Sequence, residues 1–346
     1  MSKHAARGLL SRWLGGGTPD EMAAFMGEVR SRLSALETGQ SNAAGQPEAR
    51  RAATATLVQT PPPDSIYLRF APPGHYYSTI PDPAQLIPHQ DRIFSRARQP
   101  LPGIELDDAA MLRLLDAFAP YYQDFPFVDE PRPGFRFHMD NGVYSRGDAV
   151  VLYSMLRSQK PRRVVEVGSG MSTCLLLDVN RLFFGNSIEL LSVDPYPERM
   201  LELIGPEERR QLTVIPKRLQ DVDPTIFSSL RRGDILFFDS THVAKCDSDV
   251  NHIFFDILPA IAPGVHVHFH DMFYPFEYPK DWLLEIGAAW NELYMMRTFL
   301  QYNREFRVNL FSDYVALFLA EHVQRTIPVF MRGIGSSLWL ERVEAR

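Results

Sequence analysis

The sequence predicts an α/β fold in which a mostly parallel sheet of seven strands carries helices on both faces. Short apolar runs recur between residues 163 and 269, and each is followed by a stretch with helical periodicity. Strands that alternate with helices are typical of parallel sheets, whose ligands bind at the carboxyl ends of the strands. With 346 residues, 45% of them apolar, the chain can bury one large core.

The sheet is expected within residues 145–346, which we interpret as one domain. Strands are expected at 163–167, 188–193, 212–215, 234–238, 265–269 and 306–311, with a last strand in GIGSSLWLERV. Helices are expected at 171–184, 197–204, 224–231, 248–262 and 280–301, and another after Ser312. Ser145 and Asp148 resemble a capping box, which predicts a helix that reaches about Ser158 before Pro161 ends it.

The first 144 residues predict an irregular amino-terminal extension in two parts. Residues 1–60 form a flexible region with one amphipathic helix, which Thr18 and Glu21 cap and whose apolar seam suits a homo-oligomer or docking on its own domain. Residues 61–144 are rich in Pro and aromatic residues around a helical pattern near 107–118. We interpret them as a cap segment, in which His75, Tyr76 and Tyr77 are candidates to line the substrate side.

Composition and net charge limit the classes of molecule that the chain is expected to bind. The net charge of −6 provides no basic field for a phosphate backbone, so a small-molecule or glycan substrate is favoured over nucleic acid. No apolar run reaches the ~18–20 residues of a membrane span. Cys174 and Cys246 lack the spacing of a disulfide framework or thiolate zinc site, which favours a cytoplasmic location.

A glycine-containing turn follows the first expected strand in VVEVGSGMST. Gly168 and Gly170 allow a ligand to approach the backbone, and the next helix begins with free N–H groups. A dinucleotide fingerprint requires a further glycine where Thr173 stands, so NAD is the alternative cofactor. Glu166, at the strand end, suits a ligand with an ammonium group.

Two more acids follow the second and third expected strands. Asp194 closes the second strand, where a carboxylate can accept hydrogen bonds from both ribose hydroxyls, although an ordinary Asp-Pro turn has the same sequence. Asp221, after the third strand, is a candidate acceptor for an adenine amino hydrogen.

Together with the later FFDSTH and HFHD segments, these motifs resemble class I S-adenosylmethionine-dependent methyltransferases, particularly the bacterial group related to macrocin and catechol O-methyltransferases. The resemblance implies a Rossmann-like seven-stranded fold and methyl transfer. It places S-adenosylmethionine on Glu166, Gly168, Ser169, Gly170 and Asp194, and we add Ser172, Asp221 and Asp239 as further candidate contacts of the cofactor. Ser172 replaces a glycine of many relatives, which is compatible with binding if its hydroxyl faces cofactor or solvent.

The fourth and fifth strands are expected to bring Asp239, His242, His270 and Asp271 to one rim. In catechol-type relatives, acids at these places hold a divalent ion, which implies a metal set of Asp239, His270 and Asp271. Without an ion, catalysis requires a base among His242, His270 and Asp271. His266 and His268 share the strand face of His270 but lie too far along it for one ion, and we interpret them as hydrogen-bonded core residues.

The sequence thus favours O-methylation of a small-molecule or glycan hydroxyl. The alternatives are an NAD-dependent oxidoreductase and a non-catalytic adenosyl-binding or scaffold protein. The FYPFEYPKDW loop after Asp271 is expected at the substrate entrance, which suits an aromatic or sugar acceptor.

Overall fold

The computed structural model describes residues 70–344, which divide into two compact units. The smaller unit comprises residues 70–95 and 280–289. Its elements are α5 Pro83–Leu86, η1 Ile87–His89, α6 Gln90–Ile93 and η4 Trp282–Ile286. The larger unit comprises residues 96–279 and 290–344 and contains the sheet. The region 1–60, with its expected amphipathic helix and oligomer contact, lies outside the described residues.

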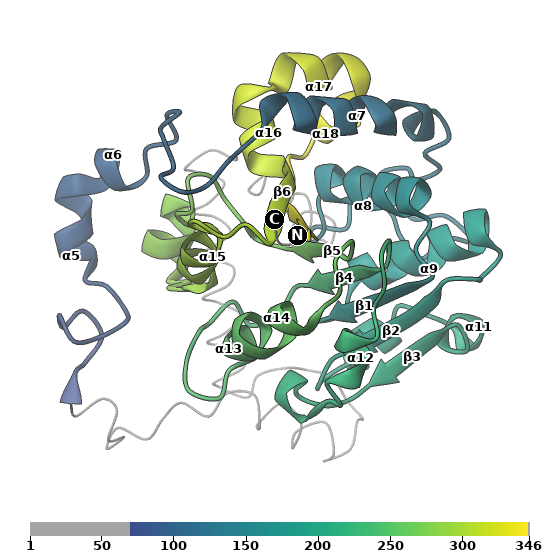
Figure 1. Ribbon diagram of the computed structural model, residues 1–346, viewed down its shortest axis with the longest axis horizontal. Coiled ribbons are helices and arrows are strands. Elements are labelled where there is room, and N and C mark those ends of the chain that lie inside the picture. The colour runs from purple at the N-terminus through teal and green to yellow at the C-terminus, as the bar shows by residue number, and fades with distance from the viewer. Residues whose placement is uncertain (1–69, 345–346) are drawn as a thin grey trace, which may run out of the picture. The chain divides into compact units, whose positions relative to one another are not determined.

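A seven-stranded sheet forms the centre of the larger unit, in the order β3-β2-β1-β4-β5-β7-β6. The strands are β1 Arg163–Val167, β2 Glu189–Val193, β3 Leu212–Ile215, β4 Ile235–Phe238, β5 His266–Phe269, β6 Phe306–Phe311 and β7 Leu338–Arg342. The first five pair in parallel, whereas β7 runs antiparallel between β5 and β6 (Figure 1). The predicted α/β fold with a mostly parallel seven-stranded sheet is therefore confirmed.

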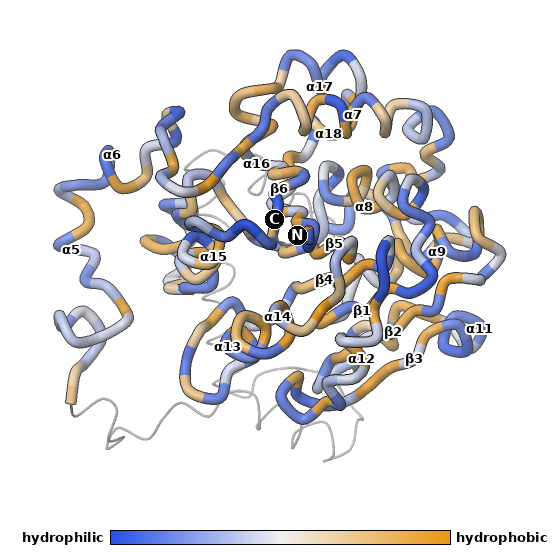
Figure 2. Tube along the Cα trace, in the orientation of Figure 1, coloured by the Kyte–Doolittle hydropathy of each residue, from blue (hydrophilic) through white to orange (hydrophobic). Residues whose placement is uncertain are grey.

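Helices cover both faces of this sheet. The helical elements of the larger unit are α7 Asp108–Gln123, α8 Arg146–Gln159, α9 Met171–Phe184, α10 Glu198–Leu201, α11 Pro206–Arg209, η2 Leu219–Asp221, α12 Thr225–Ser228, α13 Asp249–His252, η3 Ile253–Ile257, α14 Leu258–Ala260, α15 Glu292–Leu300, α16 Ser312–Phe318, α17 Ala320–Thr326 and α18 Pro328–Met331. In Figure 1, α8 and α9 lie on one face and α12, α13 and α14 on the other. The middle strand, β4, is consequently apolar along its length (Figure 2), and every residue of it is buried.

The expected helix at 280–301 is wrong, because the segment forms two separate elements. The π-helical turn Trp282–Ile286 ends at Gly287, whose φ of 78° lies in the left-handed region that glycine adopts readily. A new helix, α15, begins at Glu292 in the larger unit. This break gives Glu292 a position at a helix start.

Hydrogen bonds join the start of α8 to the segment before β7. Ser145 caps α8 by accepting a hydrogen bond from Asp148 N, as predicted, and Lys160 ends the helix in the left-handed region. The Asp148 carboxylate accepts from the backbone N–H groups of Ser336 and Ser337 at 3.2 and 3.1 Å. The segment before β7 is thereby fixed beside the first turn of α8.

The helical pattern near 107–118 forms α7, which packs on α8 and β6 within the larger unit. Asp107 caps it, and the helix continues past the expected end to Gln123. Among residues 70–344, no helix is long and apolar enough to cross a bilayer.

Candidate active site

The turn after β1 approaches the end of β4 closely. Gly168 has a φ of 85°, and a Cβ atom there would lie 1.9 Å from the carbonyl oxygen of Asp239. Only glycine therefore fits at position 168 without a shift of the backbone. At Gly170, which is extended, a Cβ atom would meet no other atom within 4 Å. The turn thus combines one tightly packed glycine with one that borders open space.

Glu166 holds this turn from beneath. Its buried carboxylate accepts hydrogen bonds from the hydroxyls of Ser172, at 2.6 Å, and Thr173, at 2.5 Å, both in the first turn of α9. Burial raises the pKa of Glu166 to about 8, against these two hydrogen bonds. The Ser172 hydroxyl therefore points to Glu166 and not to cofactor or solvent, so the condition under which this serine was compatible with binding is not met.

Asp194 lies at the end of β2, beside the same turn. One carboxylate oxygen accepts from the Ser169 hydroxyl at 2.5 Å, and the other accepts from Tyr196 N at 2.8 Å. The second contact is the bonding of an Asp turn, as the alternative interpretation expects. The first contact brings two of the expected cofactor residues together.

The Asp221 side chain is bonded to a residue outside the turn after β1. Both of its carboxylate oxygens accept from Arg218, at 2.8 and 3.0 Å, and the side chain is exposed. Arg218 also binds Asp247. The contacts of Asp221 thus support a surface ion pair and provide no support for adenine binding.

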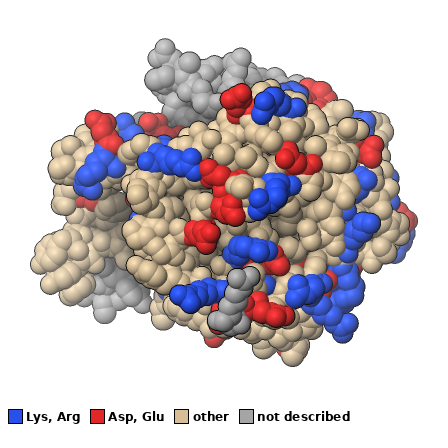
Figure 3. All heavy atoms as spheres, turned by 45° about the horizontal axis from the view of Figure 1, so that its top comes forward, with Lys and Arg blue, Asp and Glu red and all other residues tan. Residues whose placement is uncertain are grey.

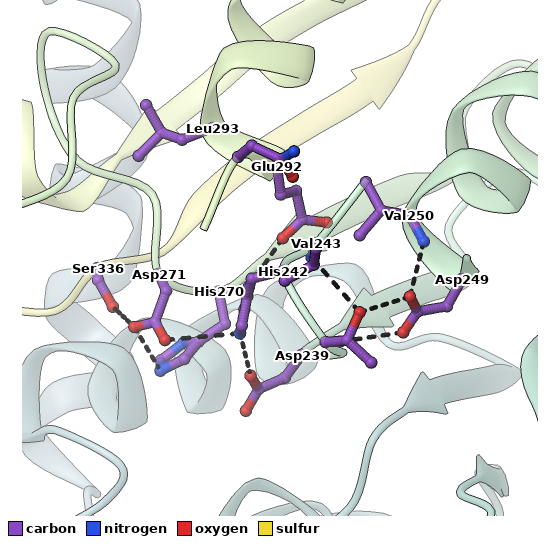
Figure 4. A network of polar contacts seen from close by, with 12 residues as sticks. Asp239, His242, Val243, Asp249, Val250, His270, Asp271, Glu292, Leu293 and Ser336 are labelled. Carbon is purple, nitrogen blue, oxygen red and sulfur yellow. Dashed lines mark hydrogen bonds and ion pairs between the residues drawn. The ribbon is translucent and has the colours of Figure 1, made fainter. Parts of the chain in front are cut away.

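At the carboxyl ends of β4 and β5, Asp239, His242 and Asp271 converge (Figure 4). The Nε2 atom of His242 lies 3.3 Å from Asp239 Oδ1 and 3.6 Å from Asp271 Oδ2. One ligand atom from each of the three residues lies within 4.8 Å of the others. Ser336 orients Asp271 by donating to its Oδ1 atom at 3.0 Å.

The expected metal set changes in one member. His270 Nε2 lies 3.7 Å from Asp271 Oδ1, and its ring stacks on Tyr144 with centroids 5.3 Å apart. His242, which follows β4 in a loop, is the histidine that meets both carboxylates. Asp239, His242 and Asp271 therefore replace Asp239, His270 and Asp271 as the candidate ligands.

The other two histidines of β5 differ from each other. His266 Nε2 lies 3.0 Å from Gln159 Oε1, as expected of a hydrogen-bonded core histidine. His268 is fully buried between Phe237 and Trp339, and within residues 70–344 neither ring nitrogen has a hydrogen-bond partner. The expectation of a hydrogen-bonded His268 is wrong.

Glu292 is the site residue that the sequence did not reveal. Its Oε2 atom lies 2.8 Å from His242 Nδ1, on the side of the ring opposite the two aspartates (Figure 4). Sequence periodicity placed Glu292 inside one long helix, where an acid is expected to face solvent. Gly287 is the signal that marks the break before it.

These buried charges shift one another's pKa values. Burial lowers the pKa of His242, but hydrogen bonds to Asp239 and Glu292 outweigh it and hold the pKa well above its usual value. Burial by itself raises the pKa of Asp239, but the nearby His270 and His242 outweigh it and lower the pKa to about 2. Burial raises the pKa values of Asp271 and Glu292. The acids around His242 thus favour a positive charge on its ring.

The FYPFEYPKDW loop contributes packing. Tyr274, Phe276 and Tyr278 are almost completely buried, so their rings do not present a surface to a substrate, contrary to expectation. His75, Tyr76 and Tyr77 contact one another in the smaller unit, and their role toward a substrate stays a prediction.

A cavity of about 1830 Å³ lies at the opposite edge of the sheet. Its lining includes Gly233 before β4, His266 at the start of β5 and Arg342 at the end of antiparallel β7. It is therefore separate from the rim.

On the face shown in Figure 3, basic and acidic side chains are interleaved.

This chain is similar to several known proteins. A family model described as a methyltransferase domain matches residues 165–272. An uncharacterized protein of Archaeoglobus fulgidus is 31% identical over 167 residues, which cover 47% of this chain and 75% of that relative. The S-adenosylhomocysteine-bound methyltransferase PaMTH1 of Podospora anserina is 13% identical, with a TM-score of 0.39 and coverage of 77% of this chain and 99% of that one. An apo-structure of CmcI is 16% identical, with a TM-score of 0.35 and coverage of 57% and 72%.

The sheet order, with its antiparallel β7, and the matched domain define a class I S-adenosylmethionine-dependent methyltransferase. Residues 165–272 match the methyltransferase domain, and the chain belongs to the same family as the uncharacterized Archaeoglobus fulgidus protein. It is accordingly an enzyme that uses S-adenosylmethionine, and the oxidoreductase and non-catalytic alternatives are set aside.

Proposed function

We propose that this enzyme methylates a hydroxyl group of a small molecule or glycan, as the resemblance to macrocin and catechol O-methyltransferases suggests, and that a divalent ion assists. The observation that carries the proposal is the convergence of Asp239, His242 and Asp271 within 4.8 Å. Methyl transfer to a hydroxyl requires removal of its proton, by a base or by an ion that acidifies it.

The geometry of the three residues fits such an ion. Two ligand atoms that are each about 2.1 Å from an ion, at roughly right angles, lie about 3 Å apart. The separations of 3.3 and 3.6 Å around His242 Nε2 are close to this value. A divalent cation also offsets the negative charge of the two aspartates and Glu292. The imidazole nitrogen favours iron, nickel, copper or zinc over magnesium, whereas the two carboxylates also suit manganese.

The cofactor is proposed to lie over the turn after β1. Gly168 and Gly170 permit close approach, Ser169 and Asp194 offer hydroxyl and carboxylate groups to the ribose, and Glu166 stabilises the turn through Ser172 and Thr173. A bound divalent ion lowers the pKa of a hydroxyl that it coordinates. Asp239 is 37% exposed, against 6% for His242, so the acceptor reaches the rim from the Asp239 side.

A chelation experiment tests the proposal. Turnover is measured as S-adenosylhomocysteine formed with a panel of catechols and sugar glycosides, before and after EDTA, and cofactor binding is measured by calorimetry. We expect EDTA to abolish turnover, manganese to restore it, and S-adenosylhomocysteine binding to persist. Activity that survives EDTA and declines as the pH falls would instead assign His242 as the base. Full activity in the single variants Asp239→Asn, Asp271→Asn, His242→Gln and His270→Gln would contradict both mechanisms.

A further inference from the structure

Glu292 is a buried carboxylate with a single described partner. One oxygen lies 2.8 Å from His242 Nδ1, and no donor among residues 70–344 reaches the other. Only 2% of the side chain is exposed. Burying an acid with half of its hydrogen-bonding capacity unused costs folding free energy. Glu292 is therefore expected to have a role that offsets this cost.

The His242 ring has one fixed orientation. It stacks on Trp290 with centroids 4.6 Å apart, and its backbone carbonyl accepts from the N–H groups of Asn291 and Glu292 at 3.1 Å. With the ring fixed, Nδ1 faces α15 and Nε2 faces Asp239 and Asp271. The two ring nitrogens therefore have different tasks.

Contacts other than the Glu292 carboxylate attach the start of α15 to the loop after β4. The Asn291 side chain accepts from Ala244 N at 2.6 Å and donates to Ala244 O at 3.1 Å, which ties the helix start to the loop after β4. The backbone bonds to His242 add to this attachment. A purely structural role for the carboxylate is thereby disfavoured.

We infer that Glu292 is a positioning residue, which keeps a proton on Nδ1 of His242 and so directs the Nε2 lone pair to the rim between Asp239 and Asp271. The reason is chemical: an ionised carboxylate only accepts hydrogen bonds, whereas a neutral imidazole has one donor and one acceptor nitrogen. Carboxylates face both ring nitrogens, but Glu292 Oε2 lies 2.8 Å from Nδ1, closer than the 3.3 and 3.6 Å that separate Nε2 from Asp239 and Asp271. The neutral ring therefore keeps its proton on Nδ1, which leaves the Nε2 lone pair to bind an ion or a proton. What Nε2 does there rests on the proposed function, but the tautomer does not.

The test measures the tautomer and metal affinity without turnover. The intact protein, labelled with ¹⁵N-histidine, is examined by NMR, free of metal at a pH where His242 is neutral, with His242→Gln used for assignment. Manganese affinity is measured by EPR on metal-stripped protein. Glu292→Gln, of nearly the same shape, is compared with Glu277→Gln, which alters a half-buried acid bonded to Tyr294 of α15 away from His242.

We expect the neutral ring of the wild type to carry its proton on Nδ1. Glu292→Gln should give mixed tautomers, because an amide can present either oxygen or nitrogen to Nδ1, and should weaken manganese binding by about 10–100-fold. Glu292→Asp should recover part of the affinity, and Glu277→Gln should match the wild type. A wild-type proton on Nε2, or equal manganese affinity in the two Gln variants, overturns the inference. Loss of turnover to EDTA tests the proposed function separately, since the NMR result is independent of it.

Discussion

The hydroxyl of Ser169 donates a hydrogen bond to Asp194 at 2.5 Å, which joins the turn after β1 to the end of β2. Two segments that are proposed to contact the cofactor are therefore coupled to each other by the protein itself. The remaining acceptor capacity of Asp194 is available to a diol, because a carboxylate offers about four lone-pair sites.

Replacing Asp194 by Ala should weaken S-adenosylhomocysteine binding by about 1–3 kcal/mol, the cost of deleting a charged hydrogen-bond partner. Calorimetry measures the change, with exposed Asp256→Ala as the control. Unchanged affinity in a folded Asp194→Ala protein would remove this residue from the site.

The two glycines of the turn should respond differently to Ala. Gly168→Ala places a methyl group against the Asp239 carbonyl at positive φ, and should lower the free energy of unfolding by about 1–3 kcal/mol. Gly170→Ala meets no protein atom, so stability should be nearly unchanged while S-adenosylhomocysteine affinity falls. Urea denaturation and calorimetry separate the two effects. Equal cofactor affinity in Gly170→Ala and the wild type would show that the ligand does not cross this position.

Glu166 should make stability fall as the pH rises. Its folded pKa of about 8 lies above its ordinary value of 4.5, so between these values the folded state binds more protons than the unfolded state. The contribution of Glu166 is therefore fully present below about pH 4.5 and is lost as the pH rises through 8. Each unit of pKa difference corresponds to about 1.4 kcal/mol. Urea denaturation at pH 5 and pH 8 should show a smaller decline for Glu166→Gln than for the wild type; identical declines would exclude this carboxyl as the cause.

Deletion of residues 1–60 should leave S-adenosylhomocysteine affinity intact, because the linker composition after the amphipathic helix predicts few core contacts. Calorimetry on the shortened chain is the measurement. Failure to obtain soluble protein would show that the region contributes to the fold.

The parallel sheet could be predicted because both of its faces are buried, which makes each strand an apolar run bounded by polar turns. Asp239 and Asp271 could be placed at one rim for the same reason, since parallel strands end on the same side. Glu292 could not, because its position depends on a helix break at Gly287 that interrupts an otherwise regular apolar period.

The sequence also could not show which of His242 and His270 contacts the two aspartates. Both follow strands that end at the rim, and spacing alone does not say which ring turns to the aspartates. The structure separates them through loop geometry: His242 adopts a φ of 59° and stacks on Trp290, whereas His270 stacks on Tyr144. The orientation of the Ser172 hydroxyl could not be predicted either, because its partner, Glu166, lies beneath the turn.

The hydrogen bond from Ser336 makes the orientation of Asp271 depend on a part of the sheet that is distant in sequence. Ser336 is held by Asp148 at the start of α8 and lies just before β7, which pairs antiparallel with both β5 and β6. The five parallel strands alone therefore do not orient this rim carboxylate. A local opening that separates β7 from β5 would release Asp271 while leaving the glycine turn after β1 intact.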